Sequence, residues 1–211
     1  MYARDIAGQE LTFGVSGKLI MNALVMYDHQ TRTLWSQFLG RGVKGELAGV
    51  ELEMVPVTQT TWSAWRDLHP DTLVLDKKGR YGSDNYRSYY GLGRAGVMGE
   101  ARRDGRLGGK ELVLGIDLDG NAKAYPFAAL ETRVVVNDAV AGNDVLVFFD
   151  RGTGTALAYL LSVAGWPLSF DLTDDGAGTQ ATLVDRETGS RWMAFTGSAI
   201  DGELKGEVLE R

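Results

Sequence analysis

Residues 28–53, DHQTRTLWSQFLGRGVKGELAGVELE, return near the end of the chain as residues 185–210, DRETGSRWMAFTGSAIDGELKGEVLE. The repeat is longer than this stretch: residues 1–53 align with residues 158–210 without a gap, and 16 of the 53 positions are identical. Several identities fall on tryptophan, phenylalanine and glycine, which chance rarely matches in register. The chain is therefore predicted to contain a tandem duplication, and this duplication organises the fold.

The composition indicates a globular, strand-rich chain. Of its 211 residues, 44% are hydrophobic and 24% are charged, values typical of a protein that buries its own core. The chain has 28 glycines but only 4 prolines, which favours many tight turns between short strands over a flexible linker. We therefore predict an α+β fold that is predominantly antiparallel β, with the duplication forming two pseudo-symmetric β-rich lobes.

The charge and the missing residue types exclude several functions. The net charge of −6 and the scattered basic residues argue against a nucleic-acid partner, because a phosphate backbone is bound by clustered Lys and Arg. The densest basic stretch, 94–106, is interrupted by Glu100 and Asp104 and is expected to be a solvated loop. No apolar run reaches the roughly 18 residues that span a bilayer, so no transmembrane segment is predicted. The chain has no cysteine, which excludes disulfides, thiolate metal sites and cysteine nucleophiles within it.

The repeat divides the chain into three parts. Residues 1–76 are predicted to form the first copy, 77–110 an irregular connecting loop, and 111–211 the second copy. The second copy begins with a segment, 111–157, that has no counterpart in the first, so a complete first copy is expected to carry about 45 more residues before Met1. The first copy continues beyond the repeat into a helix, so the second copy is expected to be incomplete at its C-terminal end.

Short strands are predicted throughout both copies. In the repeated unit they cover Leu11–Ser16, Ala23–Tyr27 and Thr33–Phe38. In the segment before the second copy, Asp119-Gly120 predicts a hairpin, because this pair supports a turn with positive φ angles. Asn137-Asp138 follows a valine run and is predicted to be a turn.

One helix is predicted, over residues 60–68. Thr60 or Thr61 can cap its N-terminus, and His69-Pro70 ends it. The apolar residues Trp62, Trp65 and Leu68 share one face at helical spacing.

Candidate site residues come from comparing the two copies. Residues shared by both copies are expected to serve the common fold, whereas polar residues found in only one copy are free to form a site. Four polar residues of the first copy become Thr173, Thr179, Met193 and Ala194 in the second. Together with one shared aspartate, they are the predicted residues for binding a small polar ligand: Ser16, Asn22, Asp28, Ser36 and Gln37. The alternative is strand-edge polarity facing water. No base is identifiable for Ser16, so no catalytic nucleophile is predicted.

The shared polar residues and the histidines favour structural roles. Asp28 and its counterpart Asp185 could act as an acid, a base or a ligand, but a turn in which the carboxylate accepts bonds from nearby backbone N–H groups is favoured. A histidine metal site would require His29 and His69, the only two histidines, to meet alongside carboxylates such as Asp71. A surface or structural role is favoured for both histidines, so no metal ligand is predicted, and the sequence leaves the cofactor open.

Three segments carry a family resemblance. The first segment runs from Leu11 through Leu24-Val25-Met26-Tyr27-Asp28 to Leu34-Trp35-Ser36-Gln37. The second contains Leu114-Gly115-Ile116, Ala124-Tyr125-Pro126 and Val136-Asn137-Asp138. The third is Trp65 followed by His69-Pro70-Asp71-Thr72. Together they resemble the domain-of-unknown-function family 3179 of bacteria and archaea. The resemblance covers most of the chain apart from 77–110. It implies no particular activity, because none is established for the family.

The resemblance also points to what this chain lacks. Family members typically carry a Cys-Pro-Leu-Cys-Gly motif just before the segment that matches Tyr2. The second copy has Asp150-Arg151-Gly152-Thr153-Gly154 there, so Asp150 and Thr153 stand in place of the cysteines. Any family metal or redox chemistry that depends on those thiols is absent from this chain. Members are often predicted to be exported, which implies an extracytoplasmic location if a segment before Met1 carries the signal.

Three functions remain open from the sequence. The first is an exported or envelope-associated module that binds a small polar ligand or a metal. The second is an enzyme of unknown reaction that uses the same polar residues. The third is a structural or interaction scaffold without a site. The sequence leaves the oligomeric state open.

Overall fold

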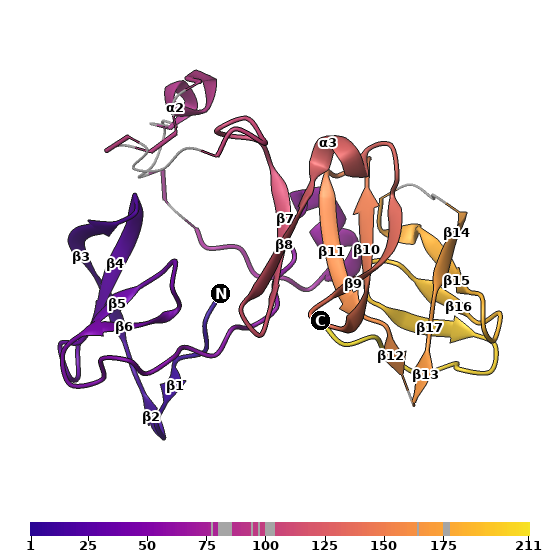
Figure 1. Ribbon diagram of the computed structural model, residues 1–211, viewed down its shortest axis with the longest axis horizontal. Helices are drawn as coiled ribbons and strands as arrows, with labels where there is room; N and C mark the ends of the chain where they lie inside the picture. Colours follow the sequence, from indigo (N-terminus) through magenta and orange to yellow (C-terminus); the bar gives the residue numbers. More distant parts are fainter. Residues whose placement is uncertain are drawn as a thin grey trace. The chain divides into compact units, whose positions relative to one another are not determined.

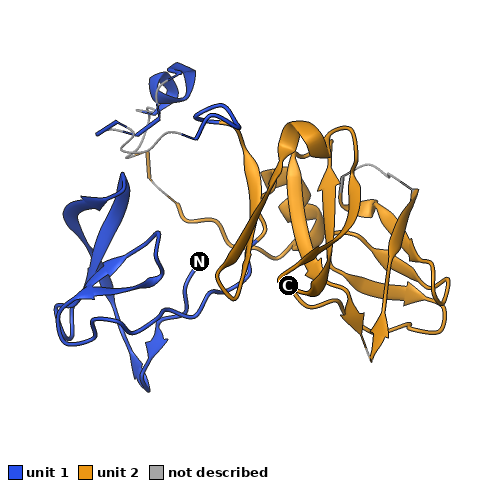
Figure 2. Ribbon diagram, in the orientation of Figure 1, with its two compact units in different colours: residues 1–57, 83–110 blue, residues 58–82, 111–211 orange. Residues whose placement is uncertain are grey.

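The computed structural model describes residues 1–76, 78–79, 86–93, 95–96, 98–99, 104–163, 165–174 and 178–211. It consists mostly of antiparallel β-sheets with a few short helices, which confirms the predicted fold class (Figure 1). The chain divides into two compact units, 1–57 with 83–110 and 58–82 with 111–211 (Figure 2). In the basic stretch predicted to be a solvated loop, Arg94, Arg102 and Arg103 lie outside the described residues.

The first unit contains the first copy of the repeat. A two-stranded sheet, β1 (Asp5–Ile6) and β2 (Gln9–Glu10), precedes a four-stranded sheet in the order β3-β4-β5-β6. The strands of this second sheet are β3 (Phe13–Ile20), β4 (Ala23–Asp28), β5 (Leu34–Ser36) and β6 (Arg41–Lys44). The stretch predicted as an irregular loop contributes one short helix, α2 (Arg87–Gly91).

The second unit contains the second copy and the segment before it. The elements of that segment are β7 (Val113–Leu118), β8 (Asn121–Pro126), α3 (Phe127–Leu130), β9 (Val135–Val140), β10 (Asn143–Asp150) and β11 (Thr155–Leu160). The elements of the repeat follow: β12 (Ser162–Val163), β13 (Trp166–Pro167), β14 (Phe170–Asp174), η1 (Gly178–Gln180), β15 (Thr182–Asp185), β16 (Arg191–Met193) and β17 (Ser198–Asp201). The predicted hairpin turn joins β7 to β8, with φ angles of 53° at Asp119 and 76° at Gly120.

The predicted helix is α1 (Trp62–Leu68), and it belongs to the second unit. The Thr61 side chain caps it by accepting a hydrogen bond from the Ala64 N–H at 3.3 Å. Leu68 packs against the core of the second copy. A helix that follows the first copy in sequence therefore covers the second copy in space.

The two four-stranded sheets repeat each other in strand order and in register. In both copies a phenylalanine on the first strand pairs with the aspartate that ends the second strand: Phe13 with Asp28, and Phe170 with Asp185. Phe13 packs edge-on against Trp35 at a centroid distance of 6.0 Å, and Phe170 packs in the same way against its tryptophan at 5.5 Å. The repeat in the sequence is thus a repeat in structure.

The copies differ in what covers the inner face of the sheet. The core of the second copy extends onto β10 and β11, where Leu146, Phe148 and Leu157 are buried. As a result Phe195 is only 2% exposed, in edge contact with Phe148. Its counterpart Phe38 is 71% exposed, and it is not part of the buried cluster that the described residues of the first copy form: Ile6, Leu11, Trp35 and Leu52.

The predicted turn at Asn137-Asp138 is wrong, because both residues lie inside β9. The Asn137 side chain donates to Phe170 O and accepts from Phe170 N, both at 2.8 Å. A side-chain amide therefore takes the place of a neighbouring strand at the outer edge of β14. Asp138 forms an ion pair with Lys123 at 2.6 Å.

Replacing Asn137 by alanine is expected to destabilise the second unit by about 1–3 kcal/mol, because it leaves two backbone groups of Phe170 unsatisfied. Chemical denaturation measures the loss, and hydrogen exchange at the Phe170 amide localises it. Asn137→Asp is the matched comparison, since it keeps the acceptor for Phe170 N but sets a carboxylate oxygen in place of the donor to Phe170 O. Equal stability of wild type and Asn137→Ala would contradict this role.

Candidate functional site

Asp28 and Asp185 are buried and form equivalent turns. The Asp28 carboxylate accepts from the Trp35 indole at 2.8 Å, from the Thr33 N–H at 3.0 Å and from the Thr31 hydroxyl at 2.9 Å. The Asp185 carboxylate accepts from the indole of Trp192 at 2.8 Å and from the N–H and hydroxyl of Thr188. Each carboxylate ties its turn to the central tryptophan of its copy, as the favoured structural role requires.

These contacts keep both aspartates ionised. Burial on its own raises the pKa of Asp28, but the bonds from Trp35, Thr31 and Thr33 outweigh it, so the pKa is lowered. The same balance, with bonds from Trp192 and Thr188, lowers the pKa of Asp185. Because each carboxylate already accepts several hydrogen bonds from its own turn and tryptophan, it stabilises the fold.

Ser16 and Ser36 lie on either side of Val25, at the middle of the sheet. The Ser16 hydroxyl donates to Val25 O at 2.5 Å and accepts from the Lys18 N–H at 3.1 Å, which closes a bulge in β3. Ser36 pairs with Val25 from β5, is buried, and accepts from the Leu39 N–H at 3.1 Å. The two hydroxyls thus lie on β3 and β5, the strands on either side of β4.

Asn22 and Gln37 have different surroundings. The Asn22 amide donates to Gly99 O at 2.7 Å and accepts from the Met98 N–H at 2.8 Å, fixing this segment to the β3–β4 turn. The Gln37 residue is exposed, and its backbone carbonyl accepts from the Tyr2 hydroxyl at 2.8 Å. Asn22 and Asp28 flank opposite ends of β4. A common ligand for the five predicted residues stays a prediction.

The two histidines each contact an aromatic ring within their own unit. His29 meets Tyr27 edge-on at 5.0 Å, and His69 lies against Trp65 at 4.2 Å. Within the described ranges, no three His, Asp or Glu side chains gather in a way that could hold a metal ion. Among the helices of those same ranges, none is long and apolar enough to cross a membrane.

An aromatic and cationic cluster lies on the outer face of the first sheet. The register places Gly14, Tyr27, Leu34 and Lys44 in one row across the four strands. The Tyr27 ring lies so close over Gly14 that a Cβ there would come within 2.6 Å of it. The Arg32 guanidinium stands 4.6 Å from the centre of the same ring. We call Tyr27, His29, Arg32 and Lys44 the outer cluster.

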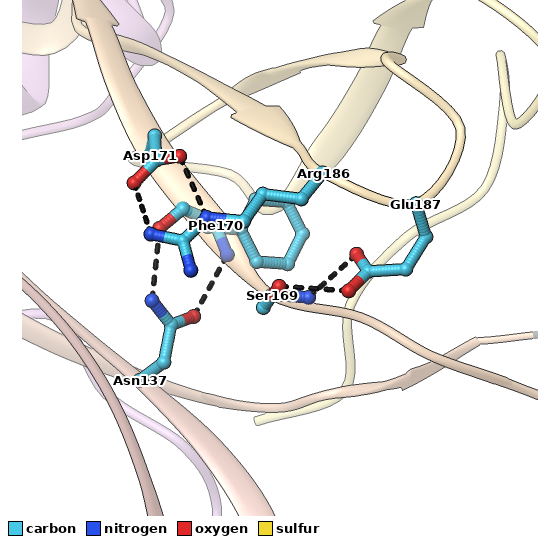
Figure 3. A network of polar contacts seen from close by, with 6 residues as sticks. All are labelled: Asn137, Ser169, Phe170, Asp171, Arg186 and Glu187. Atoms are coloured by element: carbon cyan, nitrogen blue, oxygen red, sulfur yellow. Dashed lines mark hydrogen bonds and ion pairs between the residues drawn. The ribbon is translucent and has the colours of Figure 1, made fainter.

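The same row in the second copy is closed by ion pairs. Arg186 binds Asp171 with two hydrogen bonds, at 2.7 and 2.5 Å, and this pair occupies the place of His29 and Gly14 (Figure 3). Arg191 reaches Asp201 at 3.3 Å in the place of Leu34 and Lys44. The guanidinium of Arg186 lowers the pKa of Asp171. Cations of this face therefore have anionic partners in the second copy.

The cations of the outer cluster lack such partners. Over the described residues, the ion pairs include none made by Arg32 or Lys44. Arg32 also adopts a φ angle of 61°, a left-handed conformation that costs a non-glycine residue roughly 1–2 kcal/mol. The second copy has Gly189 at this position, with a φ angle of 71°. The first copy thus keeps an arginine where the backbone favours glycine.

A third aspartate turn lies where the family resemblance places two cysteines. The Asp150 carboxylate accepts from the N–H groups of Gly152 at 3.2 Å and Thr153 at 3.0 Å, and from the Thr153 hydroxyl. The two residues that stand in place of the cysteines are therefore in direct contact. Thr155 continues the chain of bonds to Thr60, at 2.9 Å between their hydroxyl oxygens. This turn joins β10 to β11.

Sequence reasoning missed Tyr27 and Arg32 as site residues and assigned His29 a surface or structural role. The available signal was the paired change between copies: Gly14 with His29 in one, Asp171 with Arg186 in the other. Each change was visible by itself. The strand register was needed to place them side by side.

Comparison with protein-family models matches the chain twice to one family. The family model described as "Protein of unknown function (DUF3179)" matches residues 1–107 and again residues 94–211, so the two matches together cover the whole chain. No curated protein and no solved structure matches it. Two matches to one family model agree with the duplication seen in the sheets.

Proposed function

The chain belongs to the family of unknown function DUF3179, as its motifs predicted, and we propose that it is a binding module whose first copy holds a small anionic ligand on the outer cluster. The observation that carries this proposal is Arg32, which holds a left-handed backbone and places its guanidinium over Tyr27. Strained residues that a fold could replace by glycine point to a role beyond folding. The second copy has glycine, Gly189, at the position of Arg32, with the same left-handed backbone.

The sign of the charge favours an anion over a metal ion. Arg32 and Lys44 carry positively charged side chains, and the His29 ring lies beside Tyr27. A metal ion would be repelled by these groups, whereas a carboxylate or phosphate can accept hydrogen bonds from the planar guanidinium. The Tyr27 ring adds an apolar surface beside the charge. These features together support a small ligand with one anionic group and a flat or apolar part.

The five residues predicted from the sequence enter this proposal as support for the sheet under the ligand. Ser16 and Ser36 fix the strands beside Tyr27, and Asp28 fixes the turn that carries His29 and Arg32. An exported or envelope-associated location is part of the proposal and is supported only by the family resemblance.

Arg32→Gly is expected to weaken anion binding at least fivefold while leaving the protein as stable as wild type. Loss of one exposed charge-assisted contact is worth about 1 kcal/mol, which is about fivefold in affinity. Relief of the left-handed backbone offsets the lost ring contact, itself worth about 0.5–1 kcal/mol. Thermal unfolding measures the stability, and titration of wild type and variant with citrate and with inorganic phosphate measures the binding.

The second copy serves as the internal control in that titration. Amide NMR shifts are expected at Tyr27, His29 and Arg32, and none at the equivalent Val184 and Arg186. Arg32→Lys keeps the charge without the planar group, so an intermediate affinity is expected. Equal shifts in both copies, or shifts that survive Arg32→Gly unchanged, would sink the proposal.

A further inference from the structure

A second row of residues crosses the outer face of the first sheet beside the outer cluster. The register aligns Lys18, Val25, Ser36 and Arg41 across β3, β4, β5 and β6. Val25 lies two residues before Tyr27 on β4, so the two rows share one face and lie about 7 Å apart along the strands. Each end of the second row is a cation, and we call Lys18 and Arg41 the second-row cations.

The second-row cations are exposed and have no anionic partner among the described residues. The ion pairs found over the described part of the chain include none made by Lys18 or Arg41, although Glu51 forms a β-bridge to Arg41 at the edge of the sheet. The chain as a whole carries a net charge of −6. Cations that gather on one face without acidic partners are therefore not a consequence of its composition.

The second copy does not keep these cations. The register of its sheet aligns Asp174, Thr182, Met193 and Ser198 in the corresponding row. This row contains an acidic residue and no cation. Because the same four-stranded sheet forms without a cation at either end of the row, folding does not require the second-row cations.

The outer face stays open to solvent when the inner face of such a sheet is covered. In the second copy, the core on the inner face extends onto β10 and β11. On its outer face, the side chains of the ion pairs Arg186–Asp171 and Arg191–Asp201 remain between 53% and 63% exposed (Figure 3). The equivalent face of the first copy is therefore accessible to a ligand whatever covers its inner face.

We propose, on the basis of the proposed function, that the ligand of the outer cluster is an elongated dianion whose second anionic group binds the second-row cations. Arg32 and Lys44 hold the first group, and the long side chains of the second-row cations reach the second from both ends of their row. Tyr27 and Leu34 lie between the cations of the first row and offer apolar surface to the spacer. The ligand class is therefore a molecule with two anionic groups separated by an apolar spacer of about 7 Å, as in the dicarboxylate adipate.

The test compares adipate with hexanoate, which has the same chain length but only one carboxylate. Amide NMR titration of the full chain measures both affinities. Adipate is expected to bind at least about fivefold more tightly than hexanoate, because the additional charge-assisted contact is worth about 1 kcal/mol. Adipate alone is expected to shift the amides of Lys18 and Arg41. The double variant Lys18→Gln/Arg41→Gln is expected to remove the preference, so that adipate binds no more tightly than hexanoate.

Two controls make the test specific to the second row. Arg4→Gln removes a cation of the same unit that lies outside both rows and pairs with Glu10 at 2.5 Å, so this variant is expected to keep the preference for adipate. Succinate, whose carboxylates lie closer together than the two rows, is expected to bind more weakly than adipate. Equal affinity for succinate and adipate would contradict the inferred spacing.

The hexanoate titration separates failure of this inference from failure of the proposed function. If Arg32→Gly binds hexanoate as tightly as wild type does, the outer cluster is not an anion site and both proposals fall. If Arg32→Gly weakens hexanoate binding, the proposed function stands. In that case, a wild type without a preference for adipate, or a preference that survives Lys18→Gln/Arg41→Gln, would overturn the elongated dianion alone.

Discussion

Asp185→Ala is expected to lower the free energy of unfolding of the second unit by about 4 kcal/mol or more. The substitution removes a buried carboxylate and leaves the Trp192 indole N–H and the Thr188 backbone N–H without acceptors, at about 1–3 kcal/mol for each orphaned group. It also removes the contact that fixes the turn to the centre of the core. Chemical denaturation monitored by tryptophan fluorescence measures the loss.

The same carboxylate makes stability depend on pH in a defined direction. Burial raises the pKa of Asp185, but the bonds from Trp192 and Thr188 lower the pKa by a larger amount. The pKa in the folded protein therefore lies below the value in the unfolded chain. The stabilisation is therefore complete above the unfolded pKa of about 3.9 and is lost as the pH falls toward the folded pKa. Wild type is expected to lose stability below about pH 4, while Asp185→Asn loses less over that range because it has no carboxylate to protonate.

Asp28→Ala is the matched experiment in the first unit, where the corresponding bonds come from Trp35, Thr31 and Thr33. It is expected to destabilise the first unit and to leave the unfolding of the second unchanged, because these bonds of Asp28 are made within the first unit. A loss below about 1 kcal/mol in both alanine variants would show that the turns are held by other means.

The duplication was predictable because its shared residues are fixed by local geometry. Gly45 and Gly202 have φ angles of 121° and 95°, and a Cβ at either would come within 2.8 Å of Thr33 or 2.6 Å of Ser190. Only glycine satisfies such a position, so both copies keep glycine there. The buried aspartate–tryptophan pair is retained in both copies for a comparable reason.

The residues that sequence reasoning missed depend on neighbours that are distant in the chain. An asparagine after a valine run is typical of a turn, yet Asn137 is held in β9 by the backbone of Phe170, 33 positions away. The outer cluster likewise depends on which strands lie side by side. A pattern within one segment carries no information about that pairing, which only the register of the folded sheets supplies.

The fold class was predictable, but the extent of the core was not. Apolar residues of both copies follow the same pattern, so the sequence predicts two equal lobes. The β9–β11 sheet breaks that equality, because it covers the inner face of only one copy within the described residues. As a consequence, the same residue type is expected to contribute a different free energy to the stability of each copy.

Phe195→Ala is therefore expected to destabilise the second unit by about 3–5 kcal/mol, the usual range for emptying a buried phenylalanine site. Phe38→Ala at the equivalent position is expected to change the stability of the first unit by less than about 0.5 kcal/mol, since most of that ring already faces water. The two variants are matched in residue and in position in the repeat, in the turn that follows β5 or β16. Only the cover over the ring differs between them.

Differential scanning calorimetry of both variants decides the matter, with Phe148→Ala as the control. Phe148 contacts Phe195, so the double variant Phe148→Ala/Phe195→Ala is expected to lose less than the sum of the single losses. Phe38→Ala combined with Phe148→Ala is expected to be additive. A large loss from Phe38→Ala alone would contradict the exposure of this ring in the first unit.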